Sequence, residues 1–408
     1  MYFKRCTAII LSSFFGLFSV AKTPEKPTQD RIKIHPKNET IEVNEKTYRA
    51  ISYIEKTTFR GVTLNSEGKF PILEFNLSEN TVGFSVFISH LGESGELFIK
   101  SLVPKSGGKA LIDDNQVYKI KNNPYSLNQF HLSNNPYIPS VFSTISRISF
   151  PTVPSATFES GKWILQLAQA ENTIPIEEIE VFIISKVLSE PKKDEGISAL
   201  SVNVLLGNVP GLQPVPMMKM IQQQTGMDIF QTNLAEVRNT FAEASIHVML
   251  DSLEALPATA TQVPRDEQFM LHEKLTFFPK QNTPGSLNLI LLPENNATPT
   301  GTAPIDGSSW GFTDREGFGS VIAEGSAENI SSTIVHEIGH SLGLFHVEDD
   351  FLNDTCAHTH TFLEDTHDHE EHHCKNIMKI SPDRDSGFSS QQIQMMLTRP
   401  ILFDYNPK

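Results

Sequence analysis

The stretch HEIGHSLGLFH, residues 336–346, places three histidines, one glutamate and two glycines within eleven positions. His336 and His340 are four positions apart, so in a helix their imidazoles would project from the same face, about one turn apart. Apolar residues around them recur every four positions, which predicts a helix with one apolar face: Ile334, Ile338 and Leu342. The stretch therefore predicts a buried helix that presents paired imidazoles.

Two histidines at this spacing can hold one zinc ion at about 2.0–2.1 Å each. Glu337 lies about 100° around the helix, where its carboxylate can reach a water on the metal instead of binding the metal. Gly343 predicts the end of the helix, because glycine adopts the left-handed conformation readily. The chain can then turn so that His346 returns as a third ligand, which leaves a fourth position for water.

The alternative is a core helix that contains histidines by coincidence. With 14 histidines and 23 glycines in 408 residues, the additional glycine and histidine would fall in place in on the order of 0.002 of chance matches. The metal-site interpretation is therefore the favoured one.

The pattern HExxHxxGxxH of residues 336–346 resembles the zinc signature of the metzincin metallopeptidases. That family also has a methionine turn downstream, which Asn376-Ile377-Met378 matches. Residues 388–392 (FSSQQ) are similar to the start of the family's last helix, which would continue through residues 395–397. The resemblance covers residues 197–408 and in detail is nearest to the pappalysin-like branch.

The resemblance implies an exported zinc endopeptidase that hydrolyses protein or peptide substrates. It implies three zinc ligands: His336, His340 and His346. Glu337 would be the general base and then pass the proton to the leaving amine, and Met378 would form a hydrophobic floor under the metal. An extended substrate would pair with an edge strand near residues 320–323, through main-chain hydrogen bonds.

The rest of the sequence predicts two domains. Residues 46–190 show strand patterns separated by Gly-, Pro-, Asn- and Ser-rich turns, which is typical of an antiparallel β-sandwich; the strands are expected at 82–91, 96–103, 163–168 and 179–187. This sandwich would be either an accessory module or a prodomain. A polar segment, residues 189–198, marks the boundary.

Residues 197–408 predict an α/β catalytic domain with an active-site helix and a carboxyl-terminal subdomain. Apolar residues spaced by three and four predict a helix over residues 228–244. Strands are expected at residues 200–206, 246–250, 287–292 and 320–323.

The amino end predicts export. Lys4 and Arg5 precede an apolar run, residues 7–20, and small residues ending at Ala21, which together indicate a cleaved signal peptide over residues 1–21 and a secreted or periplasmic protein. The polar residues 22–45 would be a tether or an edge strand. No later segment is long and apolar enough for a membrane anchor in the mature chain. The formal net charge of −15 argues against nucleic acid as a partner.

Cys356 and Cys374 are expected to form a disulfide in an exported chain. The insertion between them carries six histidines among acidic residues: His358, His360, His367, His369, His372 and His373. Two interpretations stay open for this tract: a solvated loop, or a second site for an additional metal ion.

Two other functions share the same sequence features. One is a metal-binding adhesion or binding protein with an inactive peptidase-like domain, although the intact Glu337 argues against it. The other is a zinc hydrolase that does not act on peptide bonds.

Overall fold

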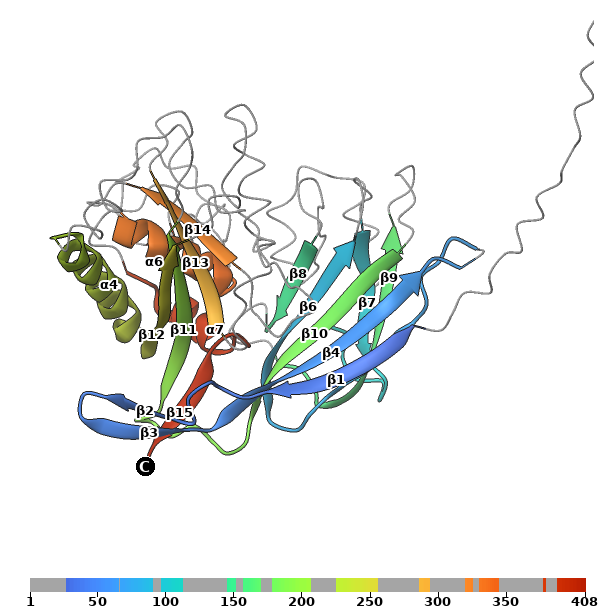
Figure 1. Cartoon of the computed structure of the whole chain (residues 1–408). Helices are drawn as coiled ribbons and strands as arrows, with labels where there is room; N and C mark the ends of the chain where they lie inside the picture. The colour runs from blue at the N-terminus through green and yellow to red at the C-terminus, as the bar shows by residue number, and fades with distance from the viewer. Residues whose placement is uncertain are drawn as a thin grey trace, which may run out of the picture.

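The computed structural model describes a β-rich molecule. It describes residues 27–65, 67–90, 97–112, 145–151, 157–169, 178–206, 225–255, 286–293, 320–325, 330–344, 377–378 and 387–408. These residues form three sheets and three helices (Figure 1).

The amino-terminal part consists of two antiparallel sheets, as its strand patterns predict. The five-stranded sheet has the order β1 (Thr28–Ile34), β4 (Ser52–Thr63), β10 (Glu178–Leu188), β6 (Thr81–His90) and β8 (Ile145–Phe150). The three-stranded sheet has the order β5 (Leu73–Leu77), β9 (Gly161–Gln169) and β7 (Leu97–Pro104). Both sheets contribute to one core, in which Phe84 of β6 contacts Phe75 of β5 and Trp163 of β9. Alternation of buried and exposed residues along β5 explains how a strand can face this core on one side and solvent on the other.

The carboxyl-terminal part is built on a seven-stranded mixed sheet. Parallel strands order as β12 (Ile246–Ala255), β11 (Ile197–Leu206), β13 (Ser286–Pro293) and β14 (Ser320–Gly325). The first residues of β11 also pair with the antiparallel strand β15 (Phe403–Pro407). The strand expected at residues 320–323 is thus β14, which runs parallel to β13 at one end of the described sheet.

Three helices accompany this sheet: α4 (Thr225–Glu243), α6 (Ile330–Ser341) and α7 (Ser390–Leu397). Buried residues of α4 and α6 share a single core with the apolar side chains of β11 and β13. The helix α7 begins with a capping box, in which Ser389 and Gln392 each bind the other's backbone nitrogen. The helices expected over residues 228–244 and from residue 390 onward are therefore present.

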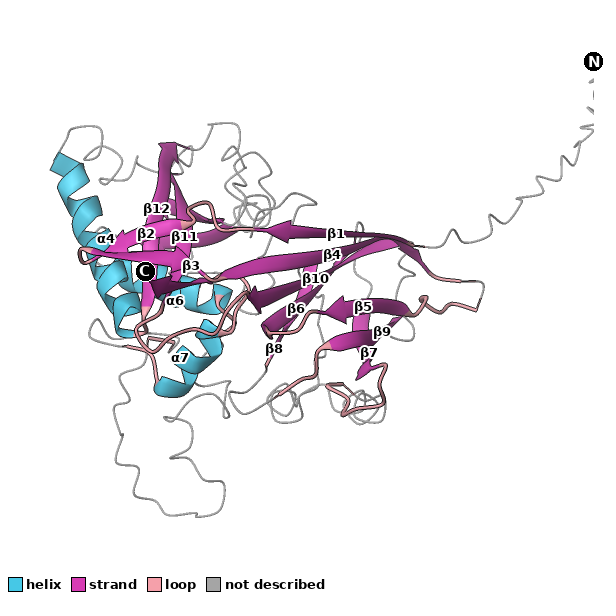
Figure 2. Cartoon of the chain, turned by 90° about the horizontal axis from the view of Figure 1, so that it is seen from below, coloured by secondary structure: helices cyan, strands magenta, loops and turns pink. Residues whose placement is uncertain are grey.

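The amino-terminal strands do not all belong to the sandwich. Residues 28–34, within the segment expected to be a tether or edge strand, form the outer strand β1. The hairpin of β2 (Thr40–Val43) and β3 (Lys46–Ala50) instead extends the carboxyl-terminal sheet, because β3 pairs with β15 (Figures 1 and 2). Ile41 and Tyr48 are buried in the carboxyl-terminal core. The region predicted as a sandwich over residues 46–190 thus has its first strand in the other sheet.

Candidate metal centre

The helix α6 is held in the core by its apolar side. Ile334, Val335 and Ile338 are buried against residues of α4 and the sheet. The same helix also buries three ionisable side chains, His336 at 7% exposure, Glu337 at 3% and His340 at 3%. Burying three ionisable groups on one helix is costly unless they have specific partners, so their surroundings decide what the site can do.

Both imidazoles are oriented by backbone carbonyls. The Nδ1 atom of His336 lies 2.7 Å from the carbonyl oxygen of Ile377, and Nδ1 of His340 lies 2.8 Å from that of Leu344. A carbonyl oxygen only accepts hydrogen bonds, so Nδ1 of each ring carries the proton. With the proton on Nδ1, the neutral form of each ring presents the lone pair of its Nε2 atom.

The two Nε2 atoms point toward each other at 3.0 Å, with the ring planes at 89°. Two lone pairs at this distance repel unless a cation or a proton lies between them. Two nitrogens bound to one tetrahedral zinc ion at about 2.0–2.1 Å would be about 3.3–3.4 Å apart, within a few tenths of an ångström of the distance found. The donor atoms, their tautomers and their spacing therefore fit a zinc ion.

A glycine ends the helix α6, which carries the two histidines. Gly343 has φ of 81°, and its backbone nitrogen donates to the carbonyl of His340 at 2.8 Å. The nitrogen of Leu344 donates to the carbonyl of Gly339 at 3.1 Å. These two bonds with a left-handed glycine define a Schellman motif. Because the chain reverses here, the carbonyl of Leu344 returns to orient His340.

Met378 lies directly against the helix, at the level of Gly339. A Cβ atom added to Gly339 would be 2.5 Å from the sulfur of Met378, and Met378 is fully buried. The preceding residue Ile377 supplies the carbonyl that orients His336 and donates its own backbone hydrogen bond to Gly387. The segment expected to be a methionine turn thus packs beside the histidine pair.

Several predicted site residues lie outside the described part of the chain. These are the signal-peptide residues 1–21, the third expected ligand His346, the cysteines Cys356 and Cys374, and the six histidines between them: His358, His360, His367, His369, His372 and His373. Within the described residues, no group of three or more His, Cys, Asp or Glu side chains is arranged to hold a metal ion. The described part of the centre is therefore the pair His336 and His340 together with Glu337.

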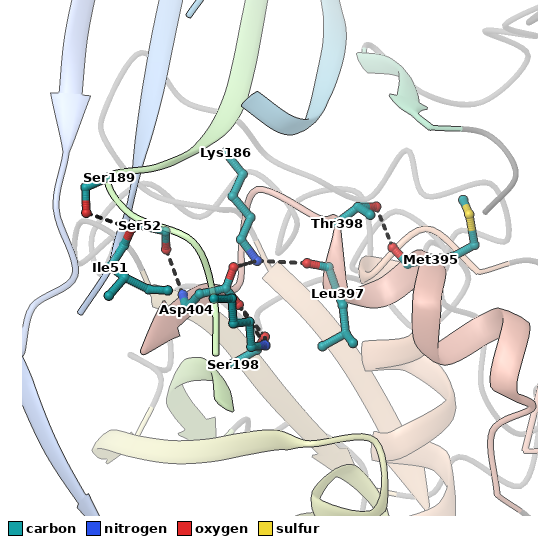
Figure 3. Close-up of polar contacts among 10 residues, drawn as sticks. Ile51, Ser52, Lys186, Ser189, Ser198, Met395, Leu397, Thr398 and Asp404 are labelled. Atoms are coloured by element: carbon teal, nitrogen blue, oxygen red, sulfur yellow. Dashed lines mark hydrogen bonds and ion pairs between the residues drawn. The ribbon is translucent and has the colours of Figure 1, made fainter. Parts of the chain in front are cut away.

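A second buried polar cluster joins the two parts of the molecule (Figure 3). The ammonium of Lys186 in β10 lies 2.7 Å from Oδ2 of Asp404 in β15 and donates to the carbonyl of Leu397 at 2.8 Å. Asp404 also accepts from Ser198 at 2.5 Å and from Lys192 at 3.2 Å. Figure 3 shows these groups between the strands of the sandwich and the end of α7.

The charges in this cluster act on Asp404. Burial raises the pKa of the Asp404 carboxyl, but the two lysine charges and the hydrogen bonds from Lys186 and Ser198 together outweigh it. The pKa of Asp404 is therefore below its ordinary value, and the group is ionised. No sequence pattern marks this cluster, because its members come from residues 186–198 and 397–404 and meet only in the folded chain.

Comparisons with known proteins add little to this geometry. No protein-family model matches the chain, and no curated protein matches it. Among the solved structures with weak similarity to this chain is the Glycosylation Associate Protein (Gap123) complex from Streptococcus agalactiae, with 9% identity over 65% of this chain, 51% of that chain and a TM-score of 0.14. This chain thus spans about half the length of that one. A similarity at this TM-score supports no inference about fold or function. Among the described residues, no helix is long and apolar enough to cross a membrane.

Proposed function

We propose that this protein is an exported zinc endopeptidase of the metzincin type that hydrolyses peptide bonds of protein substrates. The observation that carries the proposal is the facing pair of Nε2 atoms, 3.0 Å apart, on a buried helix that carries Glu337 between the two histidines and is followed by the left-handed Gly343. The match of residues 336–346 to HExxHxxGxxH supports it from the sequence side.

Different residues of the proposed site would hold the zinc ion and transfer the proton. His336 and His340 would hold the zinc ion through Nε2, while the carbonyls of Ile377 and Leu344 fix the ring orientations. His346 would complete the ligand set. Zinc, when bound, supplies Lewis-acid chemistry that polarises a substrate carbonyl and acidifies water.

Glu337 would be the general base. It follows the first ligand on α6 and is 3% exposed. Its carboxylate would take a proton from the attacking water and give it to the leaving amine. An additional metal ion bound by the tract between Cys356 and Cys374 is a separate proposal. The histidine-rich composition of that tract is its only support.

The decisive variant is Glu337→Gln. It removes the base and keeps the shape, so peptide cleavage should fall by about 10²–10⁴-fold or more, which is the usual contribution of a general base. Zinc content measured by atomic absorption should stay near that of the wild type, because Glu337 is not a proposed ligand.

Glu236→Gln is the matched control. Glu236 lies on α4 and accepts a hydrogen bond from Ser331 of α6 at 2.6 Å, so it touches the same helix outside the metal centre. This variant should keep wild-type cleavage of denatured casein. Full activity in Glu337→Gln would exclude the proposed mechanism, and zinc binding without any cleavage by the wild type would favour an inactive binding protein.

A further inference from the structure

Arg399 connects the metal helix to the amino-terminal sandwich. Its side chain is buried at 3% exposure. Its Nε atom donates to the carbonyl of Leu342, at the end of α6, at 3.0 Å. Its Nη1 atom donates to the carbonyl of Pro151, which follows β8 of the sandwich, at 3.2 Å. One planar guanidinium therefore bridges the two parts of the molecule.

The carbonyl of Leu342 occupies a sensitive place. The last carbonyls of a helix have no donor within the helix and need other partners. Those of Gly339 and His340 accept from Leu344 and Gly343 within the turn, and that of Leu342 accepts from Arg399. Leu342 immediately precedes the left-handed Gly343, so this bond holds the point where the chain reverses on its way to His346.

The sandwich in turn holds the segment that carries Arg399. Lys186 of β10 donates to the carbonyl of Leu397 at 2.8 Å. The backbone of Gly83 in β6 lies so close to Thr398 that an added Cβ would overlap its carbonyl oxygen. Residues 397–399 thus contact β6, β10 and the segment after β8, which limits the positions that the guanidinium can take.

We propose that Arg399 is a positioning residue for the metal site, and that the sandwich fixes the turn after α6 through it. This inference rests on the proposed zinc-peptidase function. It assigns the amino-terminal sandwich a role that the sequence leaves open: the sandwich is a permanent part of the functional metal centre and is not a prodomain to be discarded.

The test measures the metal site itself in the full chain. Arg399→Gln removes both donors of the fork, and Arg399→Lys keeps the charge but offers a compact ammonium without the fork geometry. Zinc affinity, measured by competition with a chelator, should fall about 10–100-fold in Arg399→Gln, as is usual for partners that orient a metal site, and Arg399→Lys should restore part of it. The visible absorption of the cobalt-substituted protein should change in Arg399→Gln, because it reports ligand geometry.

Leu165→Ala is the matched control. It removes a buried side chain from the core of the sandwich, and this aliphatic side chain makes no hydrogen bond to residues 397–399 or to α6. It should lower the melting temperature and leave zinc affinity and the cobalt spectrum unchanged. If Arg399→Gln does not fold, as judged by circular dichroism, Arg399→Lys carries the comparison.

The outcomes separate the two proposals. If the wild-type chain binds zinc, and the folded Arg399 variants show the same zinc affinity and cobalt spectrum as the wild type, the positioning role alone is overturned. Equal losses of affinity in Leu165→Ala and Arg399→Gln would also overturn it, because general destabilisation would then explain both. A wild-type chain that binds no zinc would overturn the proposed function and this inference together.

Discussion

At the scale of single residues, the contact between Gly339 and Met378 sets how closely residues 377–378 approach the helix α6. A side chain at residue 339 would place its Cβ 2.5 Å from the Met378 sulfur and 3.3 Å from its methyl carbon. Ile377 orients His336 from the same segment, at 2.7 Å. A displacement of Met378 would therefore be transmitted directly to an imidazole of the candidate metal centre.

Gly339→Ala should therefore destabilise the protein. Overpacking a buried site typically costs about 1–3 kcal/mol, which exceeds the gain of about 1 kcal/mol from replacing glycine by alanine within a helix. The free energy of unfolding in urea, measured on the metal-free protein, should fall by a net amount of up to about 2 kcal/mol.

The background variant Met378→Ala makes this prediction specific. In that background the space beside residue 339 is open, so Gly339→Ala should become neutral or stabilising, through helix propensity and partial filling of the cavity. The same destabilisation in both backgrounds would show that the clash with Met378 is not the cause.

Residue types and spacing in the sequence predicted which side chains of α6 would form the candidate metal site, but not what orients them. His336, Glu337 and His340 are identified by their spacing. The partners of the two rings are the carbonyls of Ile377 and Leu344, and a backbone carbonyl has no residue type for a pattern to detect. The contact of Arg399 could not be predicted from the sequence for a related reason: it lies 57 residues from its partner Leu342.

At the scale of elements, the last strand β15 carries a buried charge between two lysines. Asp404 lies at 5% side-chain exposure, beside Lys186 and Lys192. Its lowered pKa means that the unfolded chain takes up this proton at a higher pH than the folded chain does. The stability that Asp404 contributes is therefore fully present above its ordinary pKa of about 3.9 and is lost as the pH falls toward its lower value in the folded protein.

Asp404→Asn should lower the free energy of unfolding at pH 7 by about 3–5 kcal/mol, because it leaves the buried Lys186 without its anionic partner. The gap between wild type and variant should narrow as the pH falls from about 5 to about 3, where the wild-type carboxyl loses its advantage. Urea unfolding of the metal-free proteins across this range measures the gap.

Asp30→Asn provides the comparison for this strand. Asp30 is paired with Arg60 on the surface, at 65% exposure, so its substitution should have little effect at any pH. A gap for Asp404→Asn that stays constant down to pH 3 would contradict the assigned ionisation of Asp404.

At the scale of elements, periodicity in the sequence was sufficient to predict several of the helices and strands. The helices α4 and α6 and the strands β11 to β13 each have a long apolar pattern that is buried on one face, and the structure has them close to the expected residues. Local periodicity could not predict the sheet that the β2–β3 hairpin joins, because the partner strand β15 is more than 350 residues away in the chain. Only the folded chain decides which sheet an isolated hairpin joins.

At the scale of the whole molecule, the chain passes three times between the five-stranded sheet of the sandwich and the carboxyl-terminal sheet: between β1 and β2, between β3 and β4, and between β10 and β11. Only Ile51 separates β3 in the carboxyl-terminal sheet from β4 in the sandwich, and its backbone donates to the carbonyl of Asp404 at 2.8 Å. The return passage, between β10 and β11, begins at Ser189, whose backbone donates to the carbonyl of Ile51 at 2.7 Å. These crossings and the buried cluster around Lys186 tie the two parts together (Figure 3).

A chain cut between the two parts should therefore stay assembled. A specific protease site inserted between Asp194 and Glu195, both exposed, would allow the purified protein to be cleaved after folding. The fragments should co-elute in size-exclusion chromatography and separate only in denaturant, because the β3–β15 pairing and the Lys186–Asp404 contact do not depend on this link.

Peptidase activity gives the second measurement on the cut protein. It should match that of the uncut protein if the sandwich is a lasting part of the enzyme. Release of the amino-terminal fragment, with activity kept or increased in the remainder, would instead identify the sandwich as a prodomain.

The sequence alone determined the local chemistry of this protein: a helix with paired histidines and a glutamate, a glycine at its end, and strand patterns for a β-rich amino-terminal part. It could do so because helix and strand periods, and ligand spacing within one helix, depend on neighbours in the chain. Tertiary structure decided which carbonyls orient the rings and which sheet receives the β2–β3 hairpin. It also decided how Arg399 joins the sandwich to the end of α6, and how Lys186 joins the sandwich to the end of α7. Those contacts join residues distant in sequence, so burial and hydrogen-bond geometry in the folded chain determine them.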